Sequence, residues 1–263
     1  MTPAISASPT AAPVMKPAGP IVAVASGKGG VGKTWFAITL AHALARAGRR
    51  VLLFDGDLGL ANVDIQLGLM PAHDIGSVVA GVRTLAQAVQ THPGGFDILA
   101  GRSGSGALSA LDDVALEAVL AALREAARQY DHVILDLGAG IDRYARRMAQ
   151  FADLLLVLAT EEPTSLTDAY AVLKLHHADC GATLRDARIV VNQAGGRAGG
   201  ERTYATLARA CATFLGHTPK LAGIIRRDER VRDAVRRQTL LLLRHPNAPA
   251  AADVEALAAT LLP

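Results

Sequence analysis

Cysteine is scarce in this sequence, and that scarcity excludes several classes of protein. Among 263 residues there are two cysteines, Cys180 and Cys211, which lie far apart and form no C-x-x-C pair. This pattern argues against a disulfide framework, a zinc ribbon and a local iron–sulfur motif. It is compatible with a reducing compartment such as the cytosol.

Long apolar runs and a strong excess of one charge are also missing. No uncharged apolar run is long enough to span a bilayer, and residues 1–20 lack the charged start and apolar core of a signal peptide. The net charge of +3 is a mild basic excess, not the basic stripe of a dedicated nucleic-acid binder. We therefore expect a soluble, cytoplasmic protein with a flexible leader over residues 1–20.

What the chain does contain is a series of short apolar runs that alternate with helical patterns. The runs that predict buried strands are Ile21–Ala25, Arg50–Asp55, Phe96–Ala100, Val133–Asp136, Leu154–Ala159, Ala187–Val191 and Ala222–Ile225. Helical patterns cover Phe36–Ala47, Leu111–Gln129, Leu166–His177 and Arg202–Leu215. This alternation predicts an α/β fold, with a mostly parallel sheet and helices on both faces. Because no linker divides residues 21–263, we expect them to form one domain.

A glycine-rich segment, GKGGVGKT, joins the first predicted strand to the first predicted helix. It matches the phosphate-loop pattern G-x-x-x-x-G-K-[ST], in which backbone N–H groups and a helix N-terminus cradle phosphates. In this pattern Lys33 pairs with the β- and γ-phosphates, and the Thr34 hydroxyl is a ligand of Mg²⁺. The residues that we expect to hold the phosphates are Gly27, Lys28, Gly29, Gly30, Val31, Gly32, Lys33 and Thr34.

Three aspartates follow predicted strands at the edge of the sheet where the phosphate loop must lie. Asp136 ends an apolar strand, where a carboxylate can hold Mg²⁺ through a water molecule. Asp55 and Asp57 lie two residues apart, so in an extended chain both side chains point to the same side. One of them can support the hydrated metal while the other orients the attacking water. The alternative is that one of them only caps the next turn.

The phosphate loop contains a second lysine, Lys28, near its start. In this form the loop resembles the deviant Walker A motif of the MinD/ParA family of dimerising ATPases. The resemblance implies a P-loop NTPase fold, the cofactors ATP/ADP and Mg²⁺, and a homodimer that ATP bridges. It also implies that Lys28 reaches the nucleotide of the partner subunit and makes hydrolysis depend on dimerisation. The alternative is a solvated lysine on a loop.

The same resemblance assigns roles to other residues. Thr34, Asp55 and Asp136 are implied to serve the metal, and Asp57 is implied to position the water, so Lys28 and Asp57 are the expected catalytic residues. Asn192, in the segment VVNQ, matches the strand end whose asparagine contacts adenine in this family.

Three longer segments narrow the resemblance to the FlhG (FleN/YlxH) branch of the family, the regulators of flagellar number. They are Asp55–Leu69, Val133–Ile141 and Glu161–Lys174. The branch implies a slow, regulatory ATPase that controls the number or placement of flagella or of another polar structure. It also implies a protein partner in flagellar assembly, such as an FlhF-like GTPase. The family pattern is also matched at Asp142, Thr167 and Asp168. The sequence assigns no chemical role to these residues.

Two features depart from the family. Trp35 follows Thr34 where a small or polar residue is usual, and we expect its ring to be buried against the sheet. The last helical pattern, Asp253–Leu262, has apolar positions on one face but two carboxylates and no basic residue. That charge suits a helix docked on the core better than the usual basic membrane helix, although a membrane surface stays open as a partner.

The segment Ile225–Arg244 carries seven arginines and three acidic residues. We interpret it as a solvated helix face with ion pairs, such as Asp233 with Arg236 or Arg237, followed by a buried edge strand at Leu240–Leu243. The alternative is a patch for lipid head groups, an acidic partner or the DNA backbone. The last of these would make the protein a ParA-like partition ATPase that binds nonspecific DNA in its ATP state. The FlhG-like segments make nucleic acid the less favoured partner.

Overall fold

The computed structural model describes residues 18–57, 61–101, 112–181 and 186–262. Most of the predicted leader, the predicted helix start at Leu111 and residues 58–60 of an FlhG-like segment lie outside this range. The described strands form one eight-stranded sheet in the order β3-β4-β2-β5-β1-β6-β7-β8. All neighbours pair in parallel except β3 and β4, which are antiparallel. The prediction of a mostly parallel α/β domain is therefore confirmed.

The strands are β1 (Ile21–Ser26), β2 (Val51–Gly56), β3 (Val89–His92), β4 (Phe96–Leu99), β5 (His132–Ala139), β6 (Leu154–Ala159), β7 (Asp186–Ala194) and β8 (Lys220–Arg226). The helices are α1 (Lys33–Arg46), α2 (Val63–Leu67), α3 (Ile75–Val79), α4 (Leu85–Ala88), α5 (Asp113–Ala126), α6 (Arg143–Phe151), α7 (Pro163–Cys180), α8 (Arg197–Leu215), α9 (Glu229–Arg236), α10 (Leu241–Arg244) and α11 (Pro249–Ala259).

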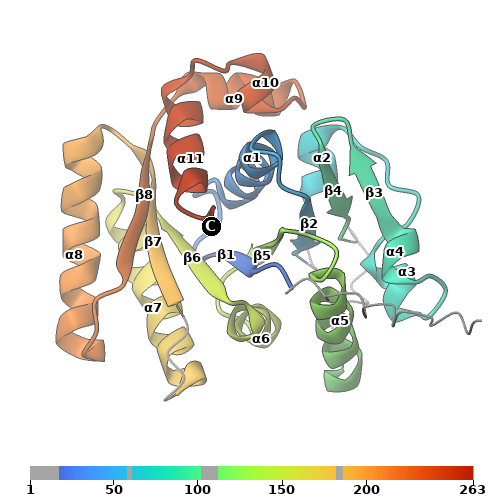
Figure 1. The fold of residues 1–263 in the computed structure, drawn as a ribbon. Helices are drawn as coiled ribbons and strands as arrows, with labels where there is room; N and C mark the ends of the chain where they lie inside the picture. The colour runs from blue at the N-terminus through green and yellow to red at the C-terminus, as the bar shows by residue number, and fades with distance from the viewer. Residues whose placement is uncertain (1–17, 58–60, 102–111, 182–185, 263) are drawn as a thin grey trace, which may run out of the picture.

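Helices cover both faces of the sheet (Figure 1). One core lies between the sheet and α5 to α8, and the other lies between the sheet and α1, α10 and α11. Because each central strand is covered on both sides, all six residues of β1, β2 and β6 are buried. This double burial is the physical reason that these strands are continuous apolar runs. Within the described parts of the chain, no helix is both long and apolar enough to cross a membrane.

All the predicted strands exist except one, and the sequence pattern missed another. The predicted strand at Leu240–Leu243 is wrong, because Leu241–Arg244 forms the short helix α10. The N–H groups of Arg244 and His245 bond to the carbonyls of Leu240 and Leu241, so this segment does not pair with a strand. The missed strand is β3, which lies at the edge of the sheet and whose sequence, VQTH, contains one apolar residue and three polar ones.

The last helix, α11, docks on the core as predicted. Val254 and Leu257 are buried between α1 and β8. Asp253, on the same helix, accepts hydrogen bonds from both the backbone N–H and the guanidinium of Arg226. The Asp253 carboxylate thus joins α11 to the end of β8. It is one of the two carboxylates that make this helix unsuited to anchor in a membrane.

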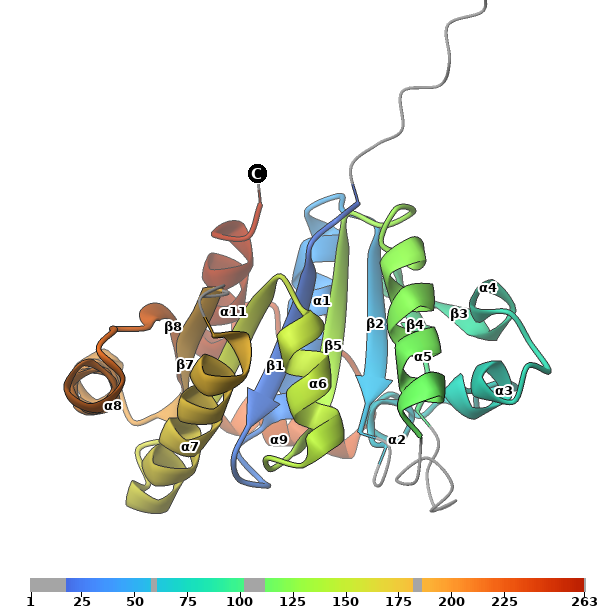
Figure 2. The same cartoon turned by 90° about the horizontal axis from the view of Figure 1, so that it is seen from below.

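The carboxyl ends of the central strands gather the site segments at one edge of the sheet. Figure 2 shows α2 and α9 beside the arrowheads of β1 and β2. The phosphate loop follows β1, Asp55 lies near the end of β2 with Asp57 directly after it, and Asn192 lies near the end of β7. This is the edge at which open parallel sheets bind ligands.

Candidate nucleotide site

The phosphate loop has the backbone shape that its glycines predict. Gly30 and Gly32 have φ angles of 81° and 86°, in the left-handed region that only glycine adopts at little cost. Gly32 is the N-cap of α1, and the helix begins at Lys33. The loop therefore ends on a helix N-terminus, whose free N–H groups and positive dipole end suit phosphate oxygens.

The first glycine of the loop is required for a different reason. A Cβ atom at Gly27 would collide with the backbone carbonyl of Asp168 on α7. This close packing gives Asp168 a structural place beside the loop, which the sequence did not assign. Asp142 is explained by local structure as well, because it caps α6 by accepting a hydrogen bond from the N–H of Ala145 at 2.8 Å.

Lys33 and Asp136 form a buried ion pair at the base of the loop. The Lys33 Nζ lies 2.8 Å from the Asp136 Oδ1, and the two side chains are 7% and 1% exposed. Burial raises the pKa of the Asp136 carboxyl, and the Lys33 ammonium opposes that rise. The other carboxylate oxygen, Oδ2, is buried and has no hydrogen-bond partner among the residues that the structure describes. Since a buried polar atom normally has a partner, Oδ2 is suited to bind something that the protein itself does not supply.

Asp55 faces Asp136 across the sheet, because the two residues are register partners on β2 and β5. Its burial and the Asp136 charge raise the pKa of Asp55 to about 7. The carboxylate accepts hydrogen bonds from the N–H groups of Asp57, Asn62 and Val63, at 3.2, 2.9 and 2.9 Å. Asp55 therefore joins the end of β2 to the start of α2, which is the capping role considered above. Its metal role stays a prediction.

Asp57 and Lys28 both border the cavity at this edge. Asp57 lies beside Gly138 of β5. Lys28 donates hydrogen bonds to Glu162 Oε2 at 2.6 Å and Thr164 Oγ1 at 3.1 Å, at the start of α7. In the single chain, then, Lys28 contacts its own α7. The Lys28 ammonium also lowers the pKa of the Glu162 carboxyl.

Asn192 supports the phosphate loop. Its Nδ2 donates a hydrogen bond to the Val31 carbonyl at 2.7 Å, and only 2% of the residue is exposed. A Cβ atom at Gly32 would lie 2.7 Å from the same nitrogen. Its neighbour Gln193 donates to the Gly30 carbonyl at 3.2 Å from a more exposed position. These contacts were not evident from the sequence, and the adenine contact of Asn192 stays a prediction.

A cavity of about 750 Å³ is lined by Lys28, Lys33, Thr34, Asp57, Asn192 and Gln193, whereas the buried Asp55 and Asp136 are not part of its lining. It extends beyond the loop to residues that the sequence did not select, on α1, α2 and α9. They include Trp35, Gln66, Val231, Arg232, Val235 and Arg236. Part of the basic segment thus borders the cavity instead of forming a separate patch.

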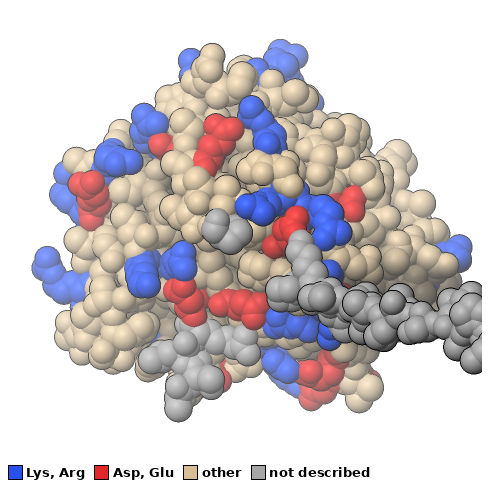
Figure 3. Space-filling model, viewed as in Figure 1, with Lys and Arg blue, Asp and Glu red and all other residues tan. Residues whose placement is uncertain are grey.

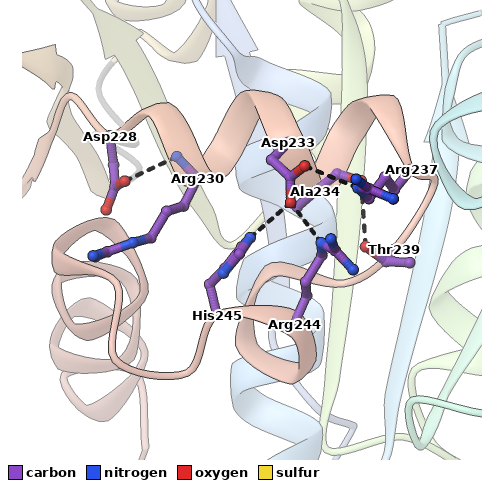
Figure 4. A network of polar contacts seen from close by, with 8 residues as sticks. All are labelled: Asp228, Arg230, Asp233, Ala234, Arg237, Thr239, Arg244 and His245. Carbon is purple, nitrogen blue, oxygen red and sulfur yellow. Dashed lines mark hydrogen bonds and ion pairs between the residues drawn. The ribbon is translucent and has the colours of Figure 1, made fainter.

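Asp233 organises the rest of the basic segment (Figure 4). Its carboxylate pairs with Arg237 at 2.9 Å, as predicted, and also contacts Arg244 and His245. The structure shows no pair between Asp233 and Arg236. Figure 3 shows basic and acidic side chains interspersed over the visible face, with no continuous basic stripe.

The fold and the loop match a known family over most of the chain. The model described as "CobQ/CobB/MinD/ParA nucleotide binding domain" matches residues 22–241. The chain belongs to this family. Among its relatives is the antiactivator FleN of Pseudomonas aeruginosa, which is 36% identical over 90% of this chain and 84% of FleN. Another is the flagellum site-determining protein YlxH of Helicobacter pylori, 30% identical over 86% of this chain and 76% of YlxH.

A solved structure with the same fold is the septum site-determining protein MinD of Pyrococcus horikoshii, complexed with Mg-ADP. It superposes with a TM-score of 0.76 over 92% of this chain and 95% of that protein, at 24% identity. The expected family is therefore confirmed, and the fold agrees with it.

Proposed function

We propose that this protein is a slow ATPase that acts as an ATP-dependent dimerising switch and regulates the number or placement of flagella. The observation that carries the proposal is the pair of lysines in one phosphate loop. Lys33 is buried against Asp136, and Lys28 is held at the exposed start of α7. Lys33 is positioned to bind phosphate within its own chain, whereas Lys28 borders the same cavity and is paired with Glu162.

The residues at the base of the loop fit a magnesium ion. Asp136 offers a buried carboxylate oxygen without a partner in the described structure, and Thr34 offers a hydroxyl at the start of α1. Carboxylate and hydroxyl oxygens are hard ligands of the kind that Mg²⁺ prefers. When bound, the ion would offset negative charge on the phosphates. Asp57, on the cavity wall, is the residue that we assign to orient the attacking water.

The switch depends on Lys28. Its pair with Glu162 is exposed, with 39% and 64% of the side chains accessible, so water and salt weaken the attraction. Lys28 can therefore leave Glu162 for the γ-phosphate of a partner subunit. A positive charge placed there stabilises the charge that accumulates in phosphoryl transfer. ATP would thus join two subunits, and hydrolysis would separate them.

The flagellar role is supported by the relatives, FleN and YlxH. We propose a protein partner in flagellar assembly, such as an FlhF-like GTPase or another regulator. Binding to nonspecific DNA is disfavoured, because Arg226, Arg237 and Arg244 are paired with carboxylates. Recruitment to a membrane surface is tested separately, by adding liposomes in the experiment below.

Size-exclusion chromatography with light scattering tests the switch. The wild type should be a monomer in Mg-ADP and shift toward a dimer in Mg-ATP. Asp57→Ala should accumulate as a dimer in ATP, because it binds ATP without hydrolysing it. Lys28→Ala should bind ATP but hydrolyse it much more slowly. Lys174→Ala, which removes an exposed lysine from α7, is the matched control and should behave as wild type.

Adding liposomes, or DNA at two salt concentrations, to the same samples tests the other partners. ATP-dependent DNA binding that falls with salt would support the partition ATPase instead. In cells, loss of the gene should change the number or position of flagella, and Lys33→Ala should fail to restore them. Normal ATP hydrolysis by Lys28→Ala would refute the switch.

A further inference from the structure

The nucleotide cavity is larger than its phosphate-binding part. One end is the phosphate loop, and the other is bordered by Trp35 on α1, Gln66 on α2 and the valines of α9. At about 750 Å³ it falls in the range of sites that enclose a whole small molecule. A nucleotide whose phosphates lie on the loop must therefore place its nucleoside elsewhere in this cavity.

Trp35 lies next to the phosphate loop. It directly follows Thr34 in the first turn of α1, so its backbone begins beside the place where the loop would hold phosphates. The residue is 8% exposed and packs in the same core as Phe36 and Leu40, as the sequence predicted. It is nevertheless one of the residues that line the cavity.

The indole is packed on its sides but not held by a hydrogen bond. Its Nε1 is buried and has no partner among the residues that the structure describes. A buried donor without an acceptor is unfavourable, so a small rotation that brings the N–H to a nucleoside oxygen or nitrogen would be favourable. Within the described part of the chain, the rotation would break no hydrogen bond of the indole N–H.

Helix α9 adds two apolar side chains to the cavity lining that includes Trp35. Val231 and Val235 are four residues apart, so they lie on the same face of α9, and both border the cavity. An indole and two valines suit the flat face of a base or the carbon face of a ribose, and they do not suit a phosphate. Charged residues of β8 and α9, among them Arg232 and Arg236, also line the cavity, so the indole and the valines form its apolar part beside polar groups.

We propose that Trp35 is a positioning residue of this chain, whose indole forms the surface on which the nucleoside of ATP or ADP rests. The inference rests on the proposed binding of a nucleotide at the phosphate loop. It assigns a role in nucleoside affinity to a residue that the phosphate-loop motif does not include.

The chain's single tryptophan makes a direct test possible. Its fluorescence, excited where tyrosine does not absorb, is titrated in the full-length wild type with Mg-ADP, Mg-ATP and Mg-pyrophosphate. We expect both nucleotides to change the intensity or the emission maximum and to protect Trp35 from a neutral quencher. Pyrophosphate, which can occupy the loop but has no nucleoside, should do neither. An equal response to pyrophosphate would overturn the proposal, because Trp35 would then report only the loop.

Variants give an independent readout by calorimetry. Trp35→Leu should weaken ADP binding about tenfold, since stacking on a base is lost, and should leave pyrophosphate binding unchanged. Trp35→Phe keeps an aromatic face and should lose less. Phe36→Leu is the matched control, because Phe36 is fully buried and does not border the cavity; it should lower the melting temperature without weakening ADP binding.

The outcomes separate this inference from the proposed function. The inference is wrong if ADP binds by calorimetry but changes no Trp35 fluorescence, and if the Trp35 variants bind ADP as tightly as the wild type. That outcome would not contradict the proposed ATP-dependent switch. If neither ADP nor ATP binds to the wild type, the proposed function itself fails. Equal loss of ADP and pyrophosphate binding in Trp35→Phe would also contradict a nucleoside contact.

Discussion

Asn192 offers the sharpest test of the site, because its observed and expected roles differ. The family resemblance predicts a contact with adenine, whereas the structure shows a hydrogen bond to the Val31 carbonyl of the phosphate loop. We predict that Asn192→Ala damages the loop. The loss should then affect every ligand that uses the loop, including one without a base.

The magnitude follows from the burial of this bond. Asn192 and Val31 are 2% and 4% exposed, so removal of the amide leaves the Val31 carbonyl away from water. An unsatisfied buried acceptor costs about 1–3 kcal/mol. For a domain of this size, each kcal/mol lowers the melting temperature by about 2–4 °C. The melting temperature of Asn192→Ala should therefore fall by about 2–12 °C.

Gln193→Ala is the matched control. It removes the neighbouring amide, which also holds the loop, but at 3.2 Å and in a more exposed position. Water can replace this bond, so the free energy of unfolding should change by less than about 1 kcal/mol. Gln193 has a φ angle of 55°, and alanine replaces it without a new backbone requirement, since both residues carry a Cβ.

Calorimetry with ATP, GTP and pyrophosphate decides between the two roles. We expect Asn192→Ala to weaken all three ligands by a similar factor, up to about tenfold, since the loop amides lose their support. If ATP binding alone weakens, with pyrophosphate binding and the melting temperature unchanged, the loop-support reasoning is refuted. Asn192 would then read the base.

Three further predictions follow from ion pairs and packing. Glu162→Gln should lower the ATP concentration at which the dimer forms, because Lys28 loses its carboxylate partner; an unchanged light-scattering titration would contradict this. Leu257→Ala should cost about 2–5 kcal/mol, because Leu257 is a residue of α11 that is buried in the core against α1, and should lower the melting temperature by about 4–20 °C. No change would mean that α11 does not dock stably. The pKa of Asp233 is lowered by hydrogen bonds from Arg244, His245 and Arg237, so its contribution to stability is present above its ordinary pKa of 3.8 and is lost as the pH falls below that value. Between pH 7 and pH 3, the melting temperature of Asp233→Asn should therefore fall less than that of the wild type. If the melting temperatures of the two proteins change in parallel with pH, this role of Asp233 is refuted.

The structural features that the sequence predicted are those that depend on local chain geometry. Gly30 and Gly32 need left-handed backbone wherever the loop lies, and the double burial of β1 is visible as an unbroken apolar run. The parallel sheet follows from the alternation of such runs with helices. These features could be predicted because neighbours along the chain decide them.

The features that the sequence did not reveal depend on distant contacts. Asn192 supports a carbonyl that lies 161 positions away in the chain. The sequence left open whether Asp55 caps the next turn, because that role depends on where Asn62 and Val63 return to β2, and no local pattern encodes that return. The strand β3 exists because β4 provides a partner at the edge of the sheet, and its own sequence carries no strand alternation.

The two lysines of the phosphate loop carry the same charge but differ in burial. Lys33 and Asp136 are almost inaccessible, so separating them without a replacement leaves a buried charge, which is strongly unfavourable. Only a ligand that brings comparable negative charge, such as a phosphate, can draw Lys33 away. Lys28 and Glu162 are exposed, and an exposed pair contributes little to stability. The proposed switch therefore assigns nucleotide binding to Lys33 and the pairing of two subunits to Lys28, which a partner's phosphate would recruit at low cost.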